Sequence, residues 1–307
     1  MFRDECLNQN WFTDLADARE CAVTENTMKM LTDSSLLENG VRIPKLGFGT
    51  WQIPDGKKAY DAVAAALEVG YRHIDTARAY GNESSVARAI ADSGIPRGDV
   101  FVTTKLPAEV KVYGEAVRSF EETLAALGMD HVDLYLIHAP WPWEEMGKDC
   151  RSGNAEVWRA MEEMYEQGRA RAIGVSNFEV ADIESLVSAA RLKPQVNQIR
   201  LFAGNPQNEV TAYCRRQGIL VEGYSPLATG SLIGNKGVRR LADKYEKSVA
   251  QLCIRYVAQK GALPLPKTTS KARMIENADV DFEIAEEDIA CLDGLQGAPR
   301  ATAASDL

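Results

Sequence analysis

The sequence contains no long apolar run, no apolar leader and few residues suited to binding metals. Its 307 residues include no stretch of about 18 apolar residues, so we expect no transmembrane helix. The first residues, MFRDECLNQNWFTD, are charged and polar where a secretory signal would be apolar. Three histidines leave little material for a zinc site, and we predict no metal. These absences favour a cytoplasmic protein without a membrane partner.

Cysteine spacing and charge exclude further classes. The six cysteines are scattered, with neither a CxxC pair nor a neighbouring histidine, which indicates reduced thiols rather than a disulfide framework. The net charge is -9, whereas duplex-DNA binders usually carry a basic face. We therefore expect no nucleic-acid partner, and an anionic small molecule would need a local basic pocket.

From residue 45 onward, short β-rich runs alternate with amphipathic helical stretches. The predicted strands span residues 46–50, 72–77, 100–106, 132–139, 170–177, 195–200, 219–226 and 262–267. The predicted helices between them include residues 57–70, 113–128, 154–168 and 248–261. Eight such units favour an α/β fold, a (β/α)8 TIM barrel. Before the first unit, SLLENGVRIPKLG predicts a β-hairpin with an Asn-Gly turn that would cap the bottom of the barrel.

Reactive side chains stand at the expected C-terminal ends of these strands. They are Thr50, Trp51, Asp75, Lys105, His138, Ser176, Asn177, Gln198, Tyr224, Ser225 and Lys267. Polar residues also simply mark strand ends in many α/β proteins. In a (β/α)8 barrel, however, these ends line the active site, and eight reactive ends in register predict one site at the mouth. The strands lack the GxGxxG of a Rossmann domain, so a nicotinamide cofactor would need another binding mode.

Eight motifs, in order, carry a resemblance to the aldo-keto reductases over about residues 35–295. They are LGFGTWQ, GYRHIDTARAYGNE, VFVTTKL, VDLYLIHAPWP, RAIGVSNF, QVNQI, EGYSPLA and PKTTSKARMIENADV. Within the family, the chain resembles the bacterial branch of diketogluconate and glyoxal reductases. The resemblance implies a TIM barrel and reversible, NADPH-dependent reduction of aldehydes or ketones to alcohols. Small dicarbonyls, keto-sugars and xenobiotic aldehydes are the substrate classes it leaves open.

The resemblance assigns catalytic roles to Asp75, Tyr80, Lys105 and His138. Tyr80 is the expected proton donor to the alkoxide-like oxygen left by hydride attack. Lys105 would lower the pKa of the Tyr80 phenol, because a neighbouring cation favours the phenolate. Asp75 would pair with Lys105, although these two alone could equally be a structural ion pair. His138 would orient the carbonyl, whereas His73 is expected to be structural.

The implied cofactor is NADPH/NADP+. Its predicted contacts are Gly49, Thr50, Trp51, Ser176, Asn177, Gln198, Tyr224, Ser225, Leu227, Lys267, Thr268, Ser270, Arg273, Glu276 and Asn277. Within this set, the resemblance places Tyr224 against the nicotinamide ring. It places Lys267, Thr268 and Arg273 at the 2′-phosphate, since Arg and Lys suit a phosphate dianion. The alternative for these cations is a solvated charged patch. Trp51, Trp141 and Phe178 are the substrate-pocket candidates, and Trp143 could also reach the pocket.

Three segments depart from the family pattern. In NQIRLFAGNPQ, Arg200 stands where many relatives carry an acidic or aromatic residue, and it would either attract a carboxylated substrate or face away. The C-terminal QGAPRATAASDL is short, which suggests broad substrate specificity. Residues 1–22 resemble a transposase fragment of insertion sequences. We expect residues 1–27 to be an extension, from a fusion or a misassigned start, or else an N-terminal helix, and residues 28–307 to be one barrel.

Two other functions fit the same fold. One is a nicotinamide-binding sensor or regulatory barrel without significant turnover. The other is an isomerase or aldolase that uses Lys105 as a Schiff base, which would leave the SNF and PKTTSKAR motifs unexplained. The resemblance also favours a monomer with a small carbonyl substrate.

Overall fold

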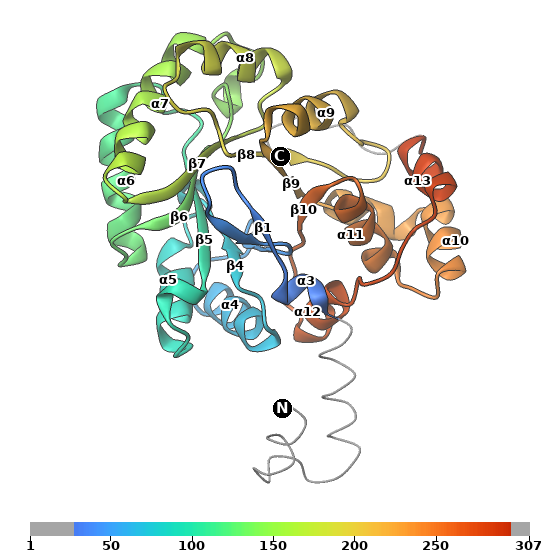
Figure 1. Ribbon diagram of the computed structural model, residues 1–307. Coiled ribbons are helices and arrows are strands. Elements are labelled where there is room, and N and C mark those ends of the chain that lie inside the picture. Colours follow the sequence, from blue (N-terminus) through green and yellow to red (C-terminus); the bar gives the residue numbers. More distant parts are fainter. Residues whose placement is uncertain (1–27, 296–307) are drawn as a thin grey trace.

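The computed structural model describes residues 28–295, and the predicted N-terminal extension and C-terminal segment lie outside them. Eight parallel strands form a barrel surrounded by helices (Figure 1). In chain order and in sheet order, they are β3 (Phe48–Gly49), β4 (His73–Asp75), β5 (Phe101–Leu106), β6 (Val132–Ile137), β7 (Ala170–Ser176), β8 (Val196–Arg200), β9 (Leu220–Tyr224) and β10 (Ala262–Leu265). Backbone bonds from Gly47 N to Pro264 O (3.1 Å) and from Gly49 N to Pro266 O (3.0 Å) join the two edge strands. The predicted TIM barrel and its eight strands are confirmed.

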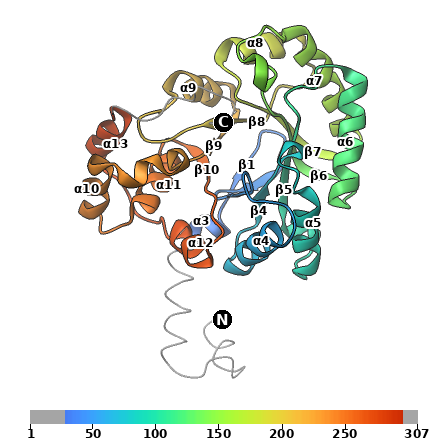
Figure 2. The same ribbon diagram turned by 180° about the vertical axis from the view of Figure 1, so that it is seen from behind.

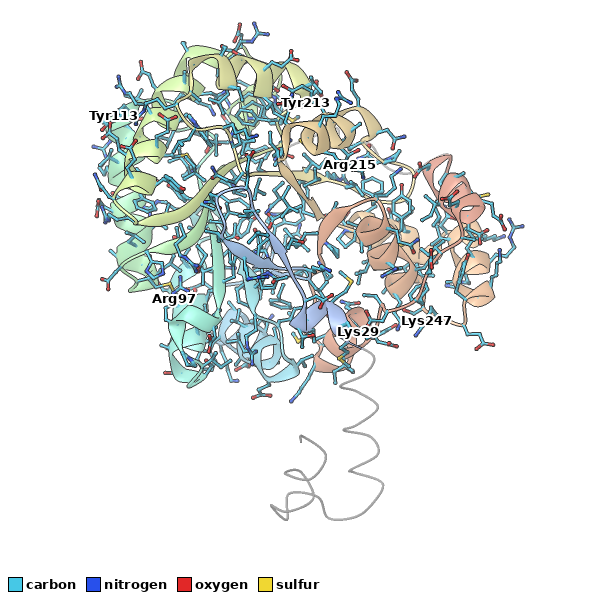
Figure 3. All side chains as sticks on the ribbon, viewed as in Figure 1. Lys29, Arg97, Tyr113, Tyr213, Arg215 and Lys247 are labelled. Atoms are coloured by element: carbon cyan, nitrogen blue, oxygen red, sulfur yellow. The ribbon has the colours of Figure 1, made fainter. Side chains whose placement is uncertain are left out.

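Helices form the outer layer, and side chains fill both this layer and the barrel interior (Figure 3). The α-helices are α3 (Lys29–Thr32), α4 (Lys57–Val69), α5 (Glu83–Asp92), α6 (Tyr113–Leu127), α7 (Arg151–Glu166), α8 (Val180–Ala189), α9 (Asn208–Gln217), α10 (Lys236–Lys244), α11 (Val249–Gln259), α12 (Lys271–Ala278) and α13 (Glu286–Asp293). The 3-10 turns are η1 (Arg78–Tyr80), η2 (Arg97–Asp99), η3 (Trp143–Glu145) and η4 (Ala228–Gly234). No helix within residues 28–295 is long and apolar enough to cross a membrane.

The predicted hairpin closes the N-terminal end of the barrel. Strands β1 (Ser34–Leu36) and β2 (Arg42–Pro44) pair antiparallel and lie across the barrel opening (Figures 1 and 2). Leu37 and Ile43 pack into the apolar cluster inside the barrel. The turn is longer than an Asn-Gly pair alone. Within it, Gly40 N donates to Leu37 O (2.9 Å), and Gly40 takes a φ of 84°, a conformation that favours glycine. The hairpin therefore excludes water from the lower half of the interior.

Inside the barrel, side chains form layers that become more polar towards the C-terminal ends of the strands. On β5, Phe101, Thr103 and Lys105 share one face, since side chains of a strand alternate between its two sides. Phe101 belongs to the apolar cluster beneath the hairpin. Thr103 accepts or donates a hydrogen bond with His73 (2.9 Å), and Lys105 lies one layer higher. The apolar floor thus positions the charged residues at the mouth.

Candidate active site

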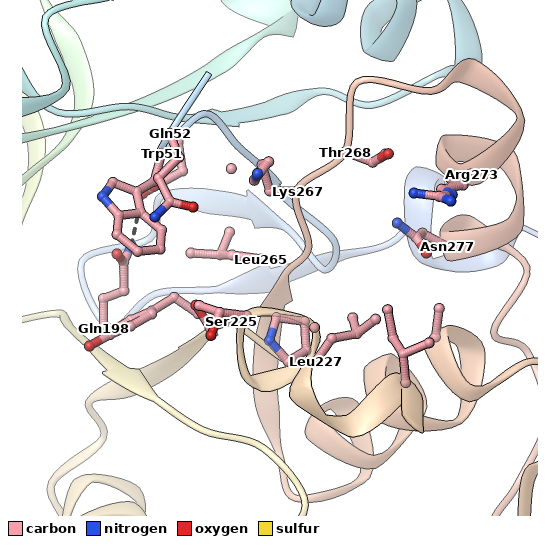
Figure 4. A pocket seen from close by; sticks show the side chains of 18 of the residues that line it. Trp51, Gln52, Gln198, Ser225, Leu227, Leu265, Lys267, Thr268, Arg273 and Asn277 are labelled. Carbon is pink, nitrogen blue, oxygen red and sulfur yellow. Dashed lines mark hydrogen bonds between the residues drawn. The ribbon is translucent and has the colours of Figure 1, made fainter. Parts of the chain in front are cut away.

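A cavity of about 510 Å³ opens at the C-terminal ends of the strands. It is elongated, with Trp51 and Gln198 towards one end and Arg273 and Asn277 towards the other (Figure 4). The predicted residues that line it are Gly49, Trp51, Asp75, Tyr80, His138, Ser176, Asn177, Gln198, Tyr224, Ser225, Leu227, Lys267, Thr268, Arg273, Glu276 and Asn277. The structure therefore brings three of the four proposed catalytic side chains and most of the proposed cofactor contacts to one surface.

Asp75 and Lys105 form a buried ion pair at one end of the cavity. The Lys105 ammonium donates to both carboxylate oxygens of Asp75 (2.8 Å each) and to Thr76 O (2.9 Å). Lys105 is 0% exposed and does not line the cavity, whereas Asp75 does. All three ammonium protons are thus used by the protein, which offsets the cost of burying the charge.

Tyr80 lies above this pair, and its electrostatics correct the sequence-based expectation. Lys105 Nζ is 5.1 Å from the centroid of the Tyr80 ring. Burial and the nearby Asp75 carboxylate nevertheless raise the pKa of Tyr80 well above its ordinary value of 10. The expected lowering by Lys105 is not seen, because burial, the largest cause, and the Asp75 charge both raise the pKa of Tyr80. The Tyr80 phenol is therefore protonated at neutral pH and can donate a hydrogen bond.

His138 faces Tyr80 across the cavity as a neutral imidazole. Its ring centroid lies 5.7 Å from that of Tyr80 and 5.2 Å from that of Trp143, both edge-on. Burial and the Lys105 charge keep the pKa of His138 well below 6.5. Its Nδ1 has no hydrogen-bond partner among the described residues. A neutral imidazole carries one ring N–H, which can donate a hydrogen bond to a carbonyl oxygen without adding charge to the site.

A second buried carboxyl, Glu222 on β9, lies beneath the ion pair. The Gln198 amide donates to both Asp75 Oδ2 and Glu222 Oε2 (2.8 Å each) and so joins the two acids. Burial and the Asp75 charge raise the pKa of Glu222 from 4.5 to about 8. On the other side, His73 lies 3.8 Å from Glu222 Oε1, and burial with the Lys105 charge lowers its pKa to about 3. His73 is therefore a buried neutral residue below the site, where the sequence predicts a structural role.

The raised pKa of Glu222 predicts a loss of stability as pH rises. Above pH 4.5 the unfolded chain ionises at Glu222 while the folded chain stays protonated until about pH 8, so folding weakens across that window. We compare the free energy of unfolding of Glu222→Gln with that of the natural protein. Between pH 5.5 and pH 7.5, we expect the variant to become more stable relative to the natural protein by about 1–3 kcal/mol. Urea unfolding at both pH values measures it, with the exposed Glu156→Gln as control. A difference in the free energy of unfolding that does not change with pH would contradict the raised pKa of Glu222.

The cofactor contacts predicted beside the ion pair hold one another in place. Tyr224 OH donates to Asn177 Oδ1 (2.8 Å), and the Asn177 amide donates to His138 O (3.0 Å). Ser176 Oγ donates to Gln198 O (2.8 Å). These bonds leave the Tyr224 ring as a wall of the cavity. An aromatic wall with amide groups beside it suits a planar ring that carries a carboxamide.

Backbone strain concentrates around the cavity. Seven non-glycine residues within residues 28–295 adopt a positive φ, and four of them line the cavity: Gln52, Asn177, Ser225 and Thr229. Side chains rarely adopt this region without compensation, so such strain often marks functional sites. The strained positions surround both the ring pocket and the channel that leads from it.

The far end of the cavity carries positive charge that no carboxylate of the described residues pairs with. Arg273 lies at this end, Lys267 lies nearer to Trp51, and Arg239 also lines the cavity (Figure 4); none of the three forms an ion pair within the described part of the chain. Ser248, which begins α11, also lines this end, with its hydroxyl accepting from Gln251 N (3.1 Å). The first turn of a helix presents free backbone N–H groups to an anion. This end therefore has the donor set of a phosphate site.

Sequence reasoning misses several residues that line the cavity. They are Gln52, Pro226, Thr229, Gly230, Ile233, Arg239, Ser248, Val249, Ala250 and Leu265. The S-x-x-Q pattern from Ser248 to Gln251 was an available signal, because it marks a helix N-terminus. No pattern in the sequence identifies Arg239, which reaches the cavity from α10.

Four predicted contacts lie elsewhere. Phe178 is 1% exposed and packs in the core between barrel and helices, because it follows β7 on the outer side of the sheet. Trp141 packs against Trp143 (5.4 Å between centroids), and Trp143 takes its expected place on the cavity wall. Thr50 is buried and bonds Asp75 O (3.0 Å), and Ser270 precedes α12 without lining the cavity. None of these four residues lines the cavity.

Arg200 takes neither of its two expected positions. It is 5% exposed and so does not face away into water, yet it does not line the cavity. Its guanidinium lies 5.2 Å from the centroid of the Phe202 ring. A substrate carboxylate in the cavity therefore does not contact it directly.

The family model for the Aldo/keto reductase family matches residues 45–296. The chain belongs to this family. It is 42% identical over 266 residues to the glyoxal reductase of Bacillus subtilis, which covers 86% of this chain and 93% of that protein. It is 40% identical over 263 residues to the 9,11-endoperoxide prostaglandin H2 reductase of Trypanosoma cruzi, covering 84% of this chain and 90% of that protein.

Solved structures agree with this assignment. An aldo/keto reductase from Brucella melitensis is 40% identical, with a TM-score of 0.78, and covers 85% of this chain and 98% of that chain. The Bombyx mori aldo-keto reductase in complex with NADP is 35% identical, with a TM-score of 0.76, covering 85% and 92% respectively.

Proposed function

We propose that this protein uses NADPH to reduce small aldehydes or ketones to alcohols. The observation that carries the proposal is one cavity with a protonated phenol and a neutral imidazole at one end and unpaired cations at the other. The similarity to the glyoxal reductase of Bacillus subtilis favours small dicarbonyls as substrates. Keto-sugars and xenobiotic aldehydes remain within the same class.

The residues fit a dinucleotide that runs along the cavity. Bound NADPH would supply the hydride. Tyr224, Asn177 and Gln198 would hold the nicotinamide end, and Lys267 with Arg273 would hold the 2′-phosphate. Arg239 and the first turn of α11 add donors that the sequence does not reveal.

In the proposed reaction, Tyr80 and His138 bind the substrate carbonyl oxygen. The protonated Tyr80 phenol donates its proton as negative charge develops on that oxygen. The Lys105 ammonium, 5.1 Å from the ring, stabilises the phenolate left behind, and Asp75 keeps Lys105 in place. Neutral His138 directs the oxygen towards Tyr80, while Trp51 and Trp143 exclude water from the reacting end.

The geometry disfavours Schiff-base chemistry at Lys105. Its ammonium makes three hydrogen bonds, and the side chain is sealed from the cavity. An amine that attacks a carbonyl must be neutral and exposed to the substrate.

NADPH oxidation by the purified protein tests the proposed function. The substrates are a panel of aldehydes, dicarbonyls and keto-sugars, and the expected result is turnover on at least one of them. Nucleotide binding without turnover across the panel would instead favour a sensor barrel. Turnover that persists in Tyr80→Phe would contradict the assigned proton donor.

Arg273→Ala is expected to weaken NADPH binding about 10- to 100-fold and NADH binding less than about threefold. The reason is that only NADPH carries the 2′-phosphate that a forked guanidinium binds. Fluorescence titration of each nucleotide measures both affinities. Arg240→Ala is the matched control, since Arg240 is exposed and does not line the cavity. Equal weakening of the two nucleotides would remove the 2′-phosphate assignment.

A further inference from the structure

Arg200 is a buried cation without a carboxylate partner, close to the ring end of the cavity. It forms no ion pair within residues 28–295, and its Nε and Nη1 have no hydrogen-bond partner among the described residues. Guanidinium groups buried to this degree are ordinarily paired. Its positive charge is therefore not neutralised locally, and it acts on whatever lies nearby.

Strand order places Arg200 beside Tyr224. The two residues are register partners on the adjacent strands β8 and β9, so their side chains leave the same face of the sheet. Tyr224 OH reaches Asn177 at the end of β7, and β8 lies between β7 and β9. The Tyr224 side chain therefore crosses β8 at the level of Arg200. Tyr224 lines the cavity and Arg200 does not, and the Arg200 guanidinium lies over the ring of Phe202.

The electrostatics of Tyr224 agree with this arrangement. Burial raises the pKa of Tyr224, and the positive charge of Arg200 partly offsets that rise. The Arg200 field therefore reaches the Tyr224 ring. Among the other ionic groups nearby, Lys105 is paired with Asp75 and Glu222 stays largely protonated at neutral pH, whereas Lys267 is a second unpaired cation that lines the cavity.

We propose that the charge of Arg200, on the strand beside Tyr224, makes the site bind NADPH more tightly than NADP+. This inference rests on the proposed function, which places the nicotinamide on the cavity side of Tyr224. The nicotinamide ring is neutral in NADPH and positive in NADP+, so an unpaired cation beside Tyr224 repels only the oxidised form. The site would retain the reductant and release the oxidised cofactor after each turnover.

The expected size of the effect is large. Two unit charges about 7–10 Å apart, at an effective dielectric of about 20, repel each other enough to change affinity roughly 10- to 50-fold. Salt weakens this repulsion little, because both charges are withdrawn from water.

Fluorescence titration of NADPH and of NADP+ at pH 7 tests the proposal on the full chain. In the natural protein we expect NADP+ to have a dissociation constant at least about tenfold above that of NADPH. Arg200→Met should tighten NADP+ binding by about that factor and leave NADPH nearly unchanged, whereas Arg200→Lys should keep the original ratio. Arg239→Met is the matched control. It removes a cation from the far end of the cavity, where the two nucleotides are identical, so it should weaken both equally.

Several results would overturn the proposal. An equal affinity for the two nucleotides in the natural protein would do so without any variant. So would an unchanged ratio in Arg200→Met, or a ratio in Arg200→Lys that matches Arg200→Met. If the natural protein bound neither nucleotide, the proposed function itself would fail, which is a distinguishable outcome.

Discussion

Tyr80→Phe is expected to lower kcat at least about 100-fold while leaving NADPH affinity within about twofold, because only the proton-donating hydroxyl is lost. The phenylalanine ring can keep the edge-on contact with His138 and the position near Lys105. Steady-state kinetics on the best substrate of the panel and a parallel NADPH titration measure the two quantities.

The matched control for this change is Tyr60→Phe. Tyr60 also donates its hydroxyl to a carboxylate, Asp92 (3.0 Å), but on the outer surface and away from the cavity. It should keep full activity. A loss of NADPH affinity that parallels the loss of kcat would assign Tyr80 to cofactor binding instead.

Lys105→Met is expected to destabilise the fold by about 3–5 kcal/mol, because it strands the buried Asp75 carboxylate without its cation. It should also abolish most turnover, since no positive charge would remain to stabilise the Tyr80 phenolate. Urea unfolding gives the first quantity and the NADPH-oxidation assay gives the second.

The double variant Asp75→Asn with Lys105→Met separates these effects. Replacing both partners removes the unpaired charge, so stability should recover by about 2 kcal/mol or more, while activity stays lost. Recovery of activity together with stability would imply that the pair is structural only. That is the alternative the sequence leaves open for these two residues.

The strand ends were the most predictable part of the site. Parallel strands of a barrel end at one mouth, so any polar residue just after a buried run is placed there by topology alone. Asp75, His138, Gln198 and Tyr224 all reach the cavity for this reason. The resemblance to aldo-keto reductases added Tyr80 and the basic cluster around Arg273, which lie in connections that topology does not position.

Side-chain direction outside the strands was much less predictable. Phe178 and Trp141 are aromatic residues of the connecting loops, and nothing in their spacing says which side of the loop they pack against. The sequence does not identify Arg239 as a cavity residue, because an arginine on a helix is ordinarily solvated. The direction of the Tyr80 pKa shift was mispredicted for a third reason, since the extent of burial of the phenol and the position of the Asp75 carboxylate are set by the fold.

The elongated cavity divides its tasks between two halves of the chain. Asp75, Tyr80, Lys105 and His138 all come from the first half, up to β6 and the residues just after it. The cationic end is built from η4, α10, α11 and α12, all in the second half. Under the proposed function, a mutation that reshapes the walls around Trp51 or Trp143 can therefore alter which carbonyl compounds are accepted without weakening nucleotide binding. Substrate range and cofactor choice can evolve separately within one barrel.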